Sequence, residues 1–293
     1  MATKKLLPVL TILIFSALIV SGNSISKTEK IPDTEIIQNP EDSVIFQKVI
    51  TRFQGKKLSV GELIIAIGKS FEGTPYVANT LENNPEEKLV VNLREFDCTT
   101  FAENCLALAR TIKSGNPTYR QFLQNLQQIR YRNGKRNQYP SRLHYFSDWL
   151  YNNAEKNIIS LPVTANSSDF PNHVNFMSKH PESYQCLKTN AEFIGQIEQT
   201  ENNISARKYF FIPKEKVAAT ENELHEGDIA GITTNISGLD IVHTVLLTRV
   251  NGRIHILHAS SSAKKVVLSD EPLADYLAKH KIQTGIMVGR PLE

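Results

Sequence analysis

The chain has 293 residues, 41% of them hydrophobic, which is enough for one large domain or two modest ones with real cores. Charged residues make up 22% and aromatic residues 8%, a composition that excludes a disordered or fibrous protein. The net charge is +3, and loss of a leader with two lysines would leave 31 basic and 30 acidic groups, which argues against general binding to nucleic acid.

The first residues have the features of an export signal. Lys4 and Lys5 precede an apolar run over 6–20, and small residues follow at 21–24. This order is typical of a secretory signal peptide. The run is shorter than the roughly twenty residues of a membrane-spanning helix, and an uncleaved anchor is the alternative. We predict a signal peptide over 1–23 and a periplasmic or secreted mature protein, with no membrane association after the signal is removed.

The predicted elements form a helical first half and a β-rich last third. A loose arm is expected over 24–41, and Gly73-Thr74-Pro75-Tyr76 marks a turn. Helices are expected over 43–53, 59–71, from Asp97 to about 113, in 116–156 and near 273–280; strands over 88–93, 208–212, 228–233, 240–250, 253–258, 265–268 and 286–290; and loops over 157–199. Helices followed by a cluster of strands predict an α+β fold.

Charge is unevenly distributed in the middle of the chain. No acidic residue lies between Glu103 and Asp148, although eight basic residues lie there. Two interpretations stay open, a solvated basic face and a surface that meets an anionic substrate.

Three cysteines are an odd number for an exported protein. Cys98 and Cys105 lie seven residues apart in one predicted helix, so about 10 Å separates their Cα atoms, too far for a disulfide. Asp97 is a good N-cap, which places Cys98 at the helix start, where the helix dipole favours a thiolate and lowers the thiol pKa. We expect Cys98 to be a nucleophile and Cys105 to be an inert core residue. Cys186 has no assigned role.

Two histidines can be placed by strand register. Asn251-Gly252 predicts a two-residue hairpin turn, so Val250 pairs with Arg253 and Val245 with His258. His243 and His258 then share one apolar sheet face as diagonal neighbours, about 7 Å apart at the backbone. The alternatives are a hydrogen-bonded core pair or half of a metal site, but no HExxH motif or pair of cysteines accompanies them. We assign His243 as general base and His258 as the residue that orients it, with no metal and no cofactor.

Several segments together resemble a known group of enzymes. Their order resembles the NlpC/P60 papain-like cell-wall hydrolases, and within that superfamily the N-acetylmuramoyl-L-alanine amidase-like family. The segments are 73–76, Asp97-Cys98-Thr99-Thr100-Phe101, 142–149, 175–181, 227–229, 238–243 and His258-Ala259-Ser260-Ser261. The resemblance covers roughly 45–292.

The resemblance implies a papain-like core in which the nucleophile helix packs on an antiparallel sheet. It implies one catalytic domain over 42–293 with a helical and loop insertion at about 114–220 that builds the substrate wall. It also implies a Cys-His-His centre of Cys98, His243 and His258, with Tyr76 near the thiol and Asp97 shaping the substrate site. The implied substrate is a peptidoglycan fragment or muropeptide, and we expect a monomer.

Three arginines are candidates to hold the carboxylates of a stem peptide, because guanidinium matches carboxylate in a bidentate manner. They are Arg94, Arg142 and Arg207. The expected reaction is hydrolysis of the amide between N-acetylmuramic acid and L-alanine. The alternatives are cleavage of the stem peptide between D-glutamate and the diamino acid, a wall-binding module without activity, and a glycosidase that uses Glu95, Asp97 or Glu103.

Overall fold

The computed structural model describes residues 1, 31–82, 84, 86–171 and 173–293. Apart from residue 1, the predicted signal peptide lies outside the described residues, as does the predicted arm up to residue 30. Within Ile31–Glu293, a compact unit, the rest of the arm forms a 3-10 turn (Asp33–Glu35) and strand β1 (Ile36–Ile37), which pairs in parallel with β2 (Leu89–Val90). None of the helices in the described ranges is both long and apolar enough to cross a membrane.

The first three long helices each begin at a capping box, in which the N-cap side chain and the residue three positions later exchange hydrogen bonds with the backbone. The helices are α1 (Pro40–Phe53), α2 (Val60–Ser70) and α3 (Cys98–Lys113), followed by α4 (Tyr119–Arg130). The helices predicted over 43–53, 59–71 and 97–113 are confirmed, whereas within 116–156 only Tyr119–Arg130 and Phe146–Glu155 are α-helical. Helix α1 starts three residues before its predicted position because Asn39 caps it and Pro40 suits the first turn.

The β-rich last third forms an antiparallel sheet with the order β4-β5-β10-β6-β7-β8-β9, and β3 pairs with the far end of β10. Its strands are β3 (Ile159–Ser160), β4 (Ser168–Asp169), β5 (Phe210–Pro213), β6 (Ile229–Thr234), β7 (Ile241–Val250), β8 (Arg253–Ser260), β9 (Lys265–Leu268) and β10 (Gln283–Pro291). The pairing of Val250 with Arg253 confirms the predicted hairpin register. The mixed α+β class with an antiparallel sheet is therefore confirmed.

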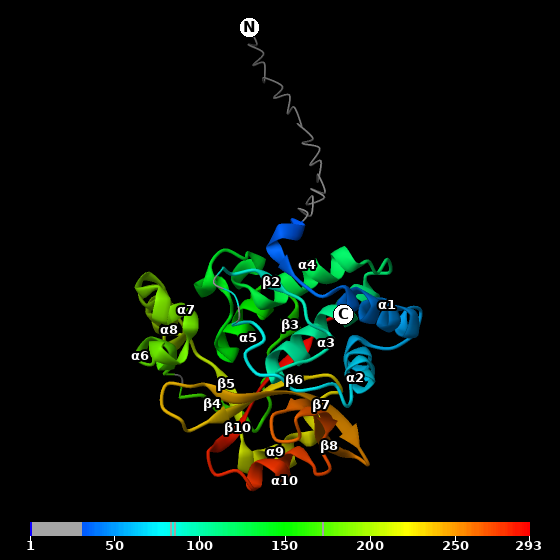
Figure 1. Cartoon of the computed structure of the whole chain (residues 1–293). Coiled ribbons are helices and arrows are strands. Elements are labelled where there is room, and N and C mark those ends of the chain that lie inside the picture. Colours follow the sequence, from blue (N-terminus) through cyan, green and yellow to red (C-terminus); the bar gives the residue numbers. More distant parts are fainter. Residues whose placement is uncertain (2–30, 83, 85, 172) are drawn as a thin grey trace. The chain divides into compact units, whose positions relative to one another are not determined.

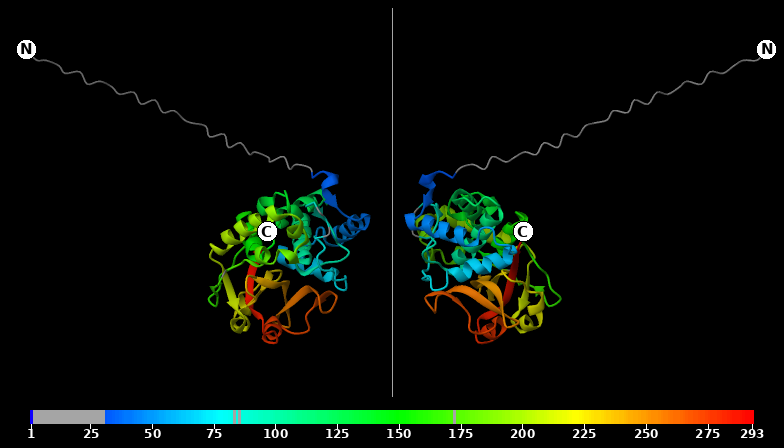
Figure 2. Two further views of the ribbon diagram at one scale, coloured as in Figure 1. Left: turned by 60° about the vertical axis from the view of Figure 1, so that its left-hand side comes forward. Right: turned by 90° about the vertical axis from the view of Figure 1, so that its right-hand side faces the viewer.

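Helices cover both faces of the sheet. Figure 1 shows α2 and α3 on one side and the shorter α9 (Lys214–Thr220) and α10 (Leu273–Ala278) on the other. In both views of Figure 2 the blue-to-green helices stay on one side of the orange strands and the red helix on the other. Leu246 and Leu257 belong to the core beneath α3, whereas Val245 and Ile256 belong to a second core beneath α9 and α10. This alternation is the period of two that a fully buried strand requires.

The segment between α4 and the sheet contains more helix than the sequence predicted. It holds α5 (Phe146–Glu155), α6 (Phe176–Lys179), α7 (Gln185–Thr189) and α8 (Ala191–Ser205). The expectation of loops over 157–199 is wrong for α8. Asn190 caps α8, and Ile197, Glu201 and Ile204 form a buried stripe at helical spacing.

Candidate active site

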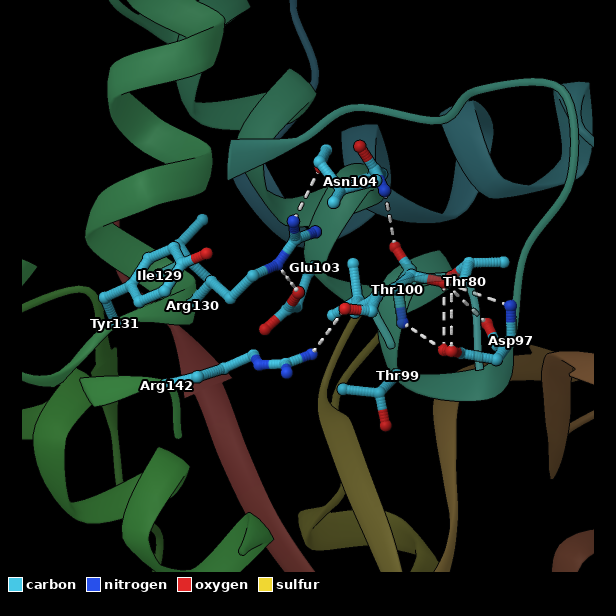
Figure 3. A network of polar contacts seen from close by, with 12 residues as sticks. Thr80, Asp97, Thr99, Thr100, Glu103, Asn104, Ile129, Arg130, Tyr131 and Arg142 are labelled. Carbon is cyan, nitrogen blue, oxygen red and sulfur yellow. Dashed lines mark hydrogen bonds and ion pairs between the residues drawn. The ribbon is translucent and has the colours of Figure 1, made fainter. Parts of the chain in front are cut away.

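Cys98 is the first residue of α3. The Asp97 carboxylate accepts a hydrogen bond from the Thr100 backbone N–H at 2.7 Å, and the Thr100 hydroxyl accepts one from the Asp97 N–H at 3.0 Å. Figure 3 shows these bonds together with Thr80, whose hydroxyl donates to Asp97 at 3.5 Å. The cap fixes the first turn of the helix, whose remaining N–H groups lie beside the partly exposed Cys98 thiol.

Cys98 and His243 line the same cavity, of about 330 Å³. Helix α3 supplies Cys98 and Thr99, and β7 supplies His243 and Thr244. The hydroxyls of Thr99 and Thr244 lie 3.3 Å apart, so a hydrogen bond joins the start of the helix to the strand at the residues that directly follow Cys98 and His243. The far wall comes from the predicted insertion, with Tyr139, the 142–146 segment, Trp149, Met177 and Tyr184.

His243 contacts His258 as the hairpin register predicts. His243 Nε2 and His258 Nδ1 lie 2.5 Å apart, and the two rings meet edge to face. His258 is 6% exposed and does not line the cavity, whereas His243 is partly exposed to it. The pairing of β6 with β7 shifts just before His243, because Ile232 pairs with His243 and Thr233 with Ile241. This bulge sets the direction of the His243 side chain at the cavity edge.

The Cys98 thiol and the His243 and His258 rings are neutral in the free protein at pH 7. Burial and the neighbouring Asp97 carboxylate raise the pKa of the Cys98 thiol to about 11, although hydrogen bonds from Thr244 and Thr99 oppose this. Burial and the adjacent His258 lower the pKa of His243 to about 3, and burial lowers that of His258 to about 4. The predicted low thiol pKa is therefore wrong, because desolvation and a like charge outweigh the helix start.

The structure places only some of the predicted substrate residues at the cavity. Tyr76 does not line the cavity, but it pairs with Phe96, two residues before Cys98, and burial and then Cys98 and Asp97 raise the pKa of its phenol. Asp97 is adjacent to Cys98, but its carboxylate is occupied by Thr100 and Thr80. Arg142 lines the cavity wall and is 5% exposed.

Arg94 and Arg207 lie away from the cavity. Arg94 Nε pairs with the buried Asp42 carboxylate at 3.2 Å. Arg207 pairs with the buried Asp148 at 2.7 Å and stacks on the ring of Tyr151, 3.9 Å from its centroid. Neither residue is part of the lining, so the structure does not bring these two arginines to Cys98.

The predicted basic face is largely paired with acidic residues from other parts of the chain. Arg130 and Glu103 form a buried ion pair at 2.7 Å, shown in Figure 3. Other pairs join Lys113 to Glu293, Arg132 to Asp148, Arg136 to Glu35, and Arg142 to Glu82 and Glu87. The acid-free stretch of sequence is therefore not a continuous basic surface.

Two cysteines lie outside this chemistry. All three thiols are free, and Cys105 is fully buried in the apolar core, where burial raises its pKa. Cys186 lies in α7 and is 9% exposed. Within the described ranges, no group of three or more His, Cys, Asp or Glu side chains is arranged to hold a metal ion.

Sequence reasoning missed Asp240, which joins the far wall to the histidine strand. Its carboxylate accepts hydrogen bonds from the Ser147 backbone N–H at 2.7 Å, from the Ser147 hydroxyl at 2.8 Å and from the Ile241 N–H at 2.8 Å. Asp240 thus caps α5 from a different part of the chain, just before the bulge that carries His243. The sequence feature that could have identified Asp240 is its position in the segment 238–243, one of the segments on which the family resemblance rests.

The comparisons with known proteins agree with this arrangement. The model of the AmiA-like family, described as N-acetylmuramoyl-L-alanine amidase-like, matches residues 66–286. The chain belongs to this family. The matched range includes Cys98, His243 and His258. No curated protein matches the chain.

Solved structures share this fold over most of the chain. An N-acetylmuramoyl-L-alanine amidase from Bacteroides uniformis is 35% identical, with a TM-score of 0.75 over 80% of this chain and 99% of that one. A Bacteroides fragilis protein proposed to be a xylanase is 38% identical, with a TM-score of 0.72 over 76% of this chain and 98% of the other. A Legionella pneumophila protein, 21% identical, shares the fold with a TM-score of 0.62 over 86% of this chain and 95% of that one.

Proposed function

We propose that the protein is an exported cysteine amidase of the NlpC/P60 papain-like type that cleaves the bond between N-acetylmuramic acid and L-alanine in peptidoglycan fragments. The observation that carries this proposal is the cavity that both Cys98 and His243 line. His258 supports His243 there through a hydrogen bond between His243 Nε2 and His258 Nδ1 at 2.5 Å. Family membership and the name of the Bacteroides uniformis relative support the choice of bond.

The reaction needs one particular tautomer of the hydrogen-bonded histidine pair. Only one proton lies between His243 Nε2 and His258 Nδ1 when both rings are neutral. If His243 Nε2 carries it and donates to His258, Nδ1 of His243 is unprotonated and can accept the thiol proton. His258 is then the acceptor that holds the base in its useful form.

The reaction proceeds through a thioester. As His243 removes the thiol proton, the Cys98 sulfur attacks the lactyl carbonyl carbon, and N–H groups at the start of α3 stabilise the oxyanion. His243 then gives its proton to the L-alanine nitrogen, and the C–N bond breaks. Water attacks the thioester with His243 again as base, which releases N-acetylmuramic acid and restores the thiol. Because Cys98 is protonated at rest, proton transfer accompanies attack.

The bond that is cut can be identified from the products. A purified muropeptide is digested, and the products are weighed by mass spectrometry. The proposal predicts N-acetylmuramic acid and an intact stem peptide. A sugar that still carries L-alanine and D-glutamate would establish the endopeptidase alternative and refute the amidase.

Two further classes are tested by substitutions at the thiol. A wall-binding module would keep its cellular role after Cys98→Ala, whereas the amidase would lose it. A glycosidase would stay active after Cys98→Ser. The glycosidase is disfavoured because Glu103 is 2% exposed and paired with Arg130, Asp97 caps α3, and Glu95 does not line the cavity.

A further inference from the structure

The hairpin of β7 and β8 opens at the end that carries the two histidines. The ladder of backbone pairs between the two strands ends at Leu246 and Leu257. Beyond that point β8 pairs with β9, and β7 pairs with β6 alone among the described strands. The bulge beside His243 interrupts the pairing with β6 as well. The backbone that carries His243 therefore receives less support from the sheet than the rest of β7 does.

The first turn of α3 contacts this part of β7 through a pair of hydroxyls. Thr244 lies on the same face of β7 as Leu246, which belongs to the core beneath α3. The Thr244 hydroxyl lies 3.3 Å from that of Thr99, and Figure 3 shows Thr99 on the side of the first turn that faces the strands. Thr244 is 2% exposed, and Thr99 is partly exposed. The bond between them is therefore largely shielded from bulk water, which strengthens it.

The place of these threonines in the chain links their bond to the reacting atoms. Thr99 directly follows Cys98, and Thr244 directly follows His243. Because each peptide unit is rigid, a shift of α3 against β7 at the hydroxyl pair moves the sulfur relative to the imidazole by a similar distance. A misplacement of about 1 Å between reacting groups can lower a rate about 100-fold. The hydroxyl pair is therefore well placed to set the distance between the thiol and its base.

The same two residues act on the sulfur itself. Burial and then the Asp97 carboxylate raise the pKa of the Cys98 thiol, whereas hydrogen bonds from the Thr244 backbone and from the side chain and backbone of Thr99 lower it. A hydroxyl has one proton, so when Thr99 donates to Cys98 Sγ, its oxygen accepts the proton of Thr244. Since Asp97 opposes the thiolate and the His243 ring is neutral, these uncharged donors favour the thiolate as it forms.

We infer that the Thr99–Thr244 hydroxyl pair positions the Cys98 sulfur against His243 and directs the Thr99 hydroxyl to that sulfur. The inference rests on the proposed function, through the roles given there to Cys98 and His243. Thr99 contacts the reacting sulfur. Thr244 acts through Thr99 and is a positioning residue.

The first test follows alkylation of Cys98 by iodoacetamide at pH 9, which does not depend on the substrate or on the bond that is cut. Thr99→Val keeps the shape of the side chain but loses the donor to the sulfur, so the rate at Cys98 should fall about three- to tenfold. Thr99→Ser keeps the hydroxyl and should react within about twofold of the wild-type rate. An unchanged rate in Thr99→Val, or an equal fall in Thr99→Ser, would overturn the inference.

The second test measures kcat and KM for N-acetylmuramoyl-L-alanyl-D-isoglutamine. Thr99→Val and Thr244→Val should each lower kcat about tenfold and leave KM within about twofold, because the pair acts on the sulfur rather than on bound substrate. The double variant should be no slower than Thr99→Val, since both substitutions break the same bond. Losses that multiply in the double variant would show two independent contributions and contradict the pair as a unit.

A matched control lies elsewhere in the same sheet. Thr284→Val breaks a similar hydroxyl pair, between Thr233 and Thr284 at 2.7 Å, and neither residue lines the cavity. The alkylation rate and kcat should both stay within about twofold of the wild-type values. A fall as large as that of Thr99→Val would show a general effect of losing an internal hydroxyl and would refute the inference.

The two measurements separate this inference from the proposed function. Cleavage of the muropeptide at another bond, or no cleavage, with alkylation rates in the predicted order would refute the proposed function alone. Cleavage at the predicted bond with wild-type rates in both valine variants would refute the role of the Thr99–Thr244 pair alone.

Discussion

His243 and His258 are joined by a 2.5 Å contact between Nε2 of the first ring and Nδ1 of the second. The two residues are fifteen positions apart, and the two-residue turn at Asn251-Gly252 sets the strand register that brings them together. His243 reaches the cavity edge, while His258 is buried. Both rings are held neutral by burial, so the pair is suited to accept a proton rather than to supply a permanent charge.

Replacement of His258 should damage catalysis without abolishing binding. We expect His258→Ala to lower kcat about 100-fold with little change in KM, because His243 loses the acceptor that fixes its tautomer. His258→Asn should recover part of the activity, since an amide oxygen can accept the same bond. His255→Gln is the control, because His255 bonds to the Ser269 carbonyl on the other face of β8. Equal loss in all three variants would indicate a purely structural role.

Alkylation of Cys98 should be slow at neutral pH. Only the thiolate reacts, and the thiol pKa is about 11, so the rate of reaction with iodoacetamide should rise about tenfold for each pH unit between 7 and 10. The rate at each cysteine is followed by peptide mass spectrometry, with Cys105 as the buried reference. A rate that is already constant below pH 7 would show a thiolate–imidazolium pair at rest and contradict the neutral centre.

Acid should destabilise the protein through the histidine pair. The folded pKa values of His243 and His258, about 3 and about 4, lie below the ordinary value of 6.5. The unfolded chain therefore binds more protons, and the stability that the neutral rings contribute is complete above pH 6.5 and is lost as the pH falls toward 3. The melting temperature should fall less steeply between pH 6.5 and 4 in His258→Gln than in the wild type. Parallel curves would contradict these shifts.

The buried ion pair behind the nucleophile helix should be essential for stability. Glu103→Gln leaves the Arg130 guanidinium, 2% exposed, without its counter-charge, and we expect the free energy of unfolding to fall by about 3–5 kcal/mol. Asp169→Asn breaks the exposed pair with Lys208 and should change it by about 0.5 kcal/mol or less. Denaturant titration measures both. A similar small effect at the two sites would refute the structural role of the Glu103–Arg130 pair.

Local rules in the sequence predicted the parts of the site that depend on short-range geometry. Asp97 as N-cap placed Cys98 at the start of α3, and the two-residue turn placed His243 against His258. Long-range pairing was not predictable. The sequence does not indicate that Arg94 pairs with Asp42 or that Arg207 pairs with Asp148, because each partner lies more than fifty residues away. The raised pKa of the Cys98 thiol likewise depends mainly on its burial in the folded protein, which local sequence does not reveal.

Trapping the thioester tests most directly whether Cys98 is the nucleophile and which bond is cut. The protein is mixed with a muropeptide, quenched in acid within its first turnovers, digested and mapped by mass spectrometry. We predict an N-acetylmuramoyl group on the peptide that contains Cys98, and no such group in the His243→Gln protein. A modified residue other than Cys98, or an acyl group made of sugar with L-alanine and D-glutamate attached, would contradict the proposed nucleophile or the proposed bond.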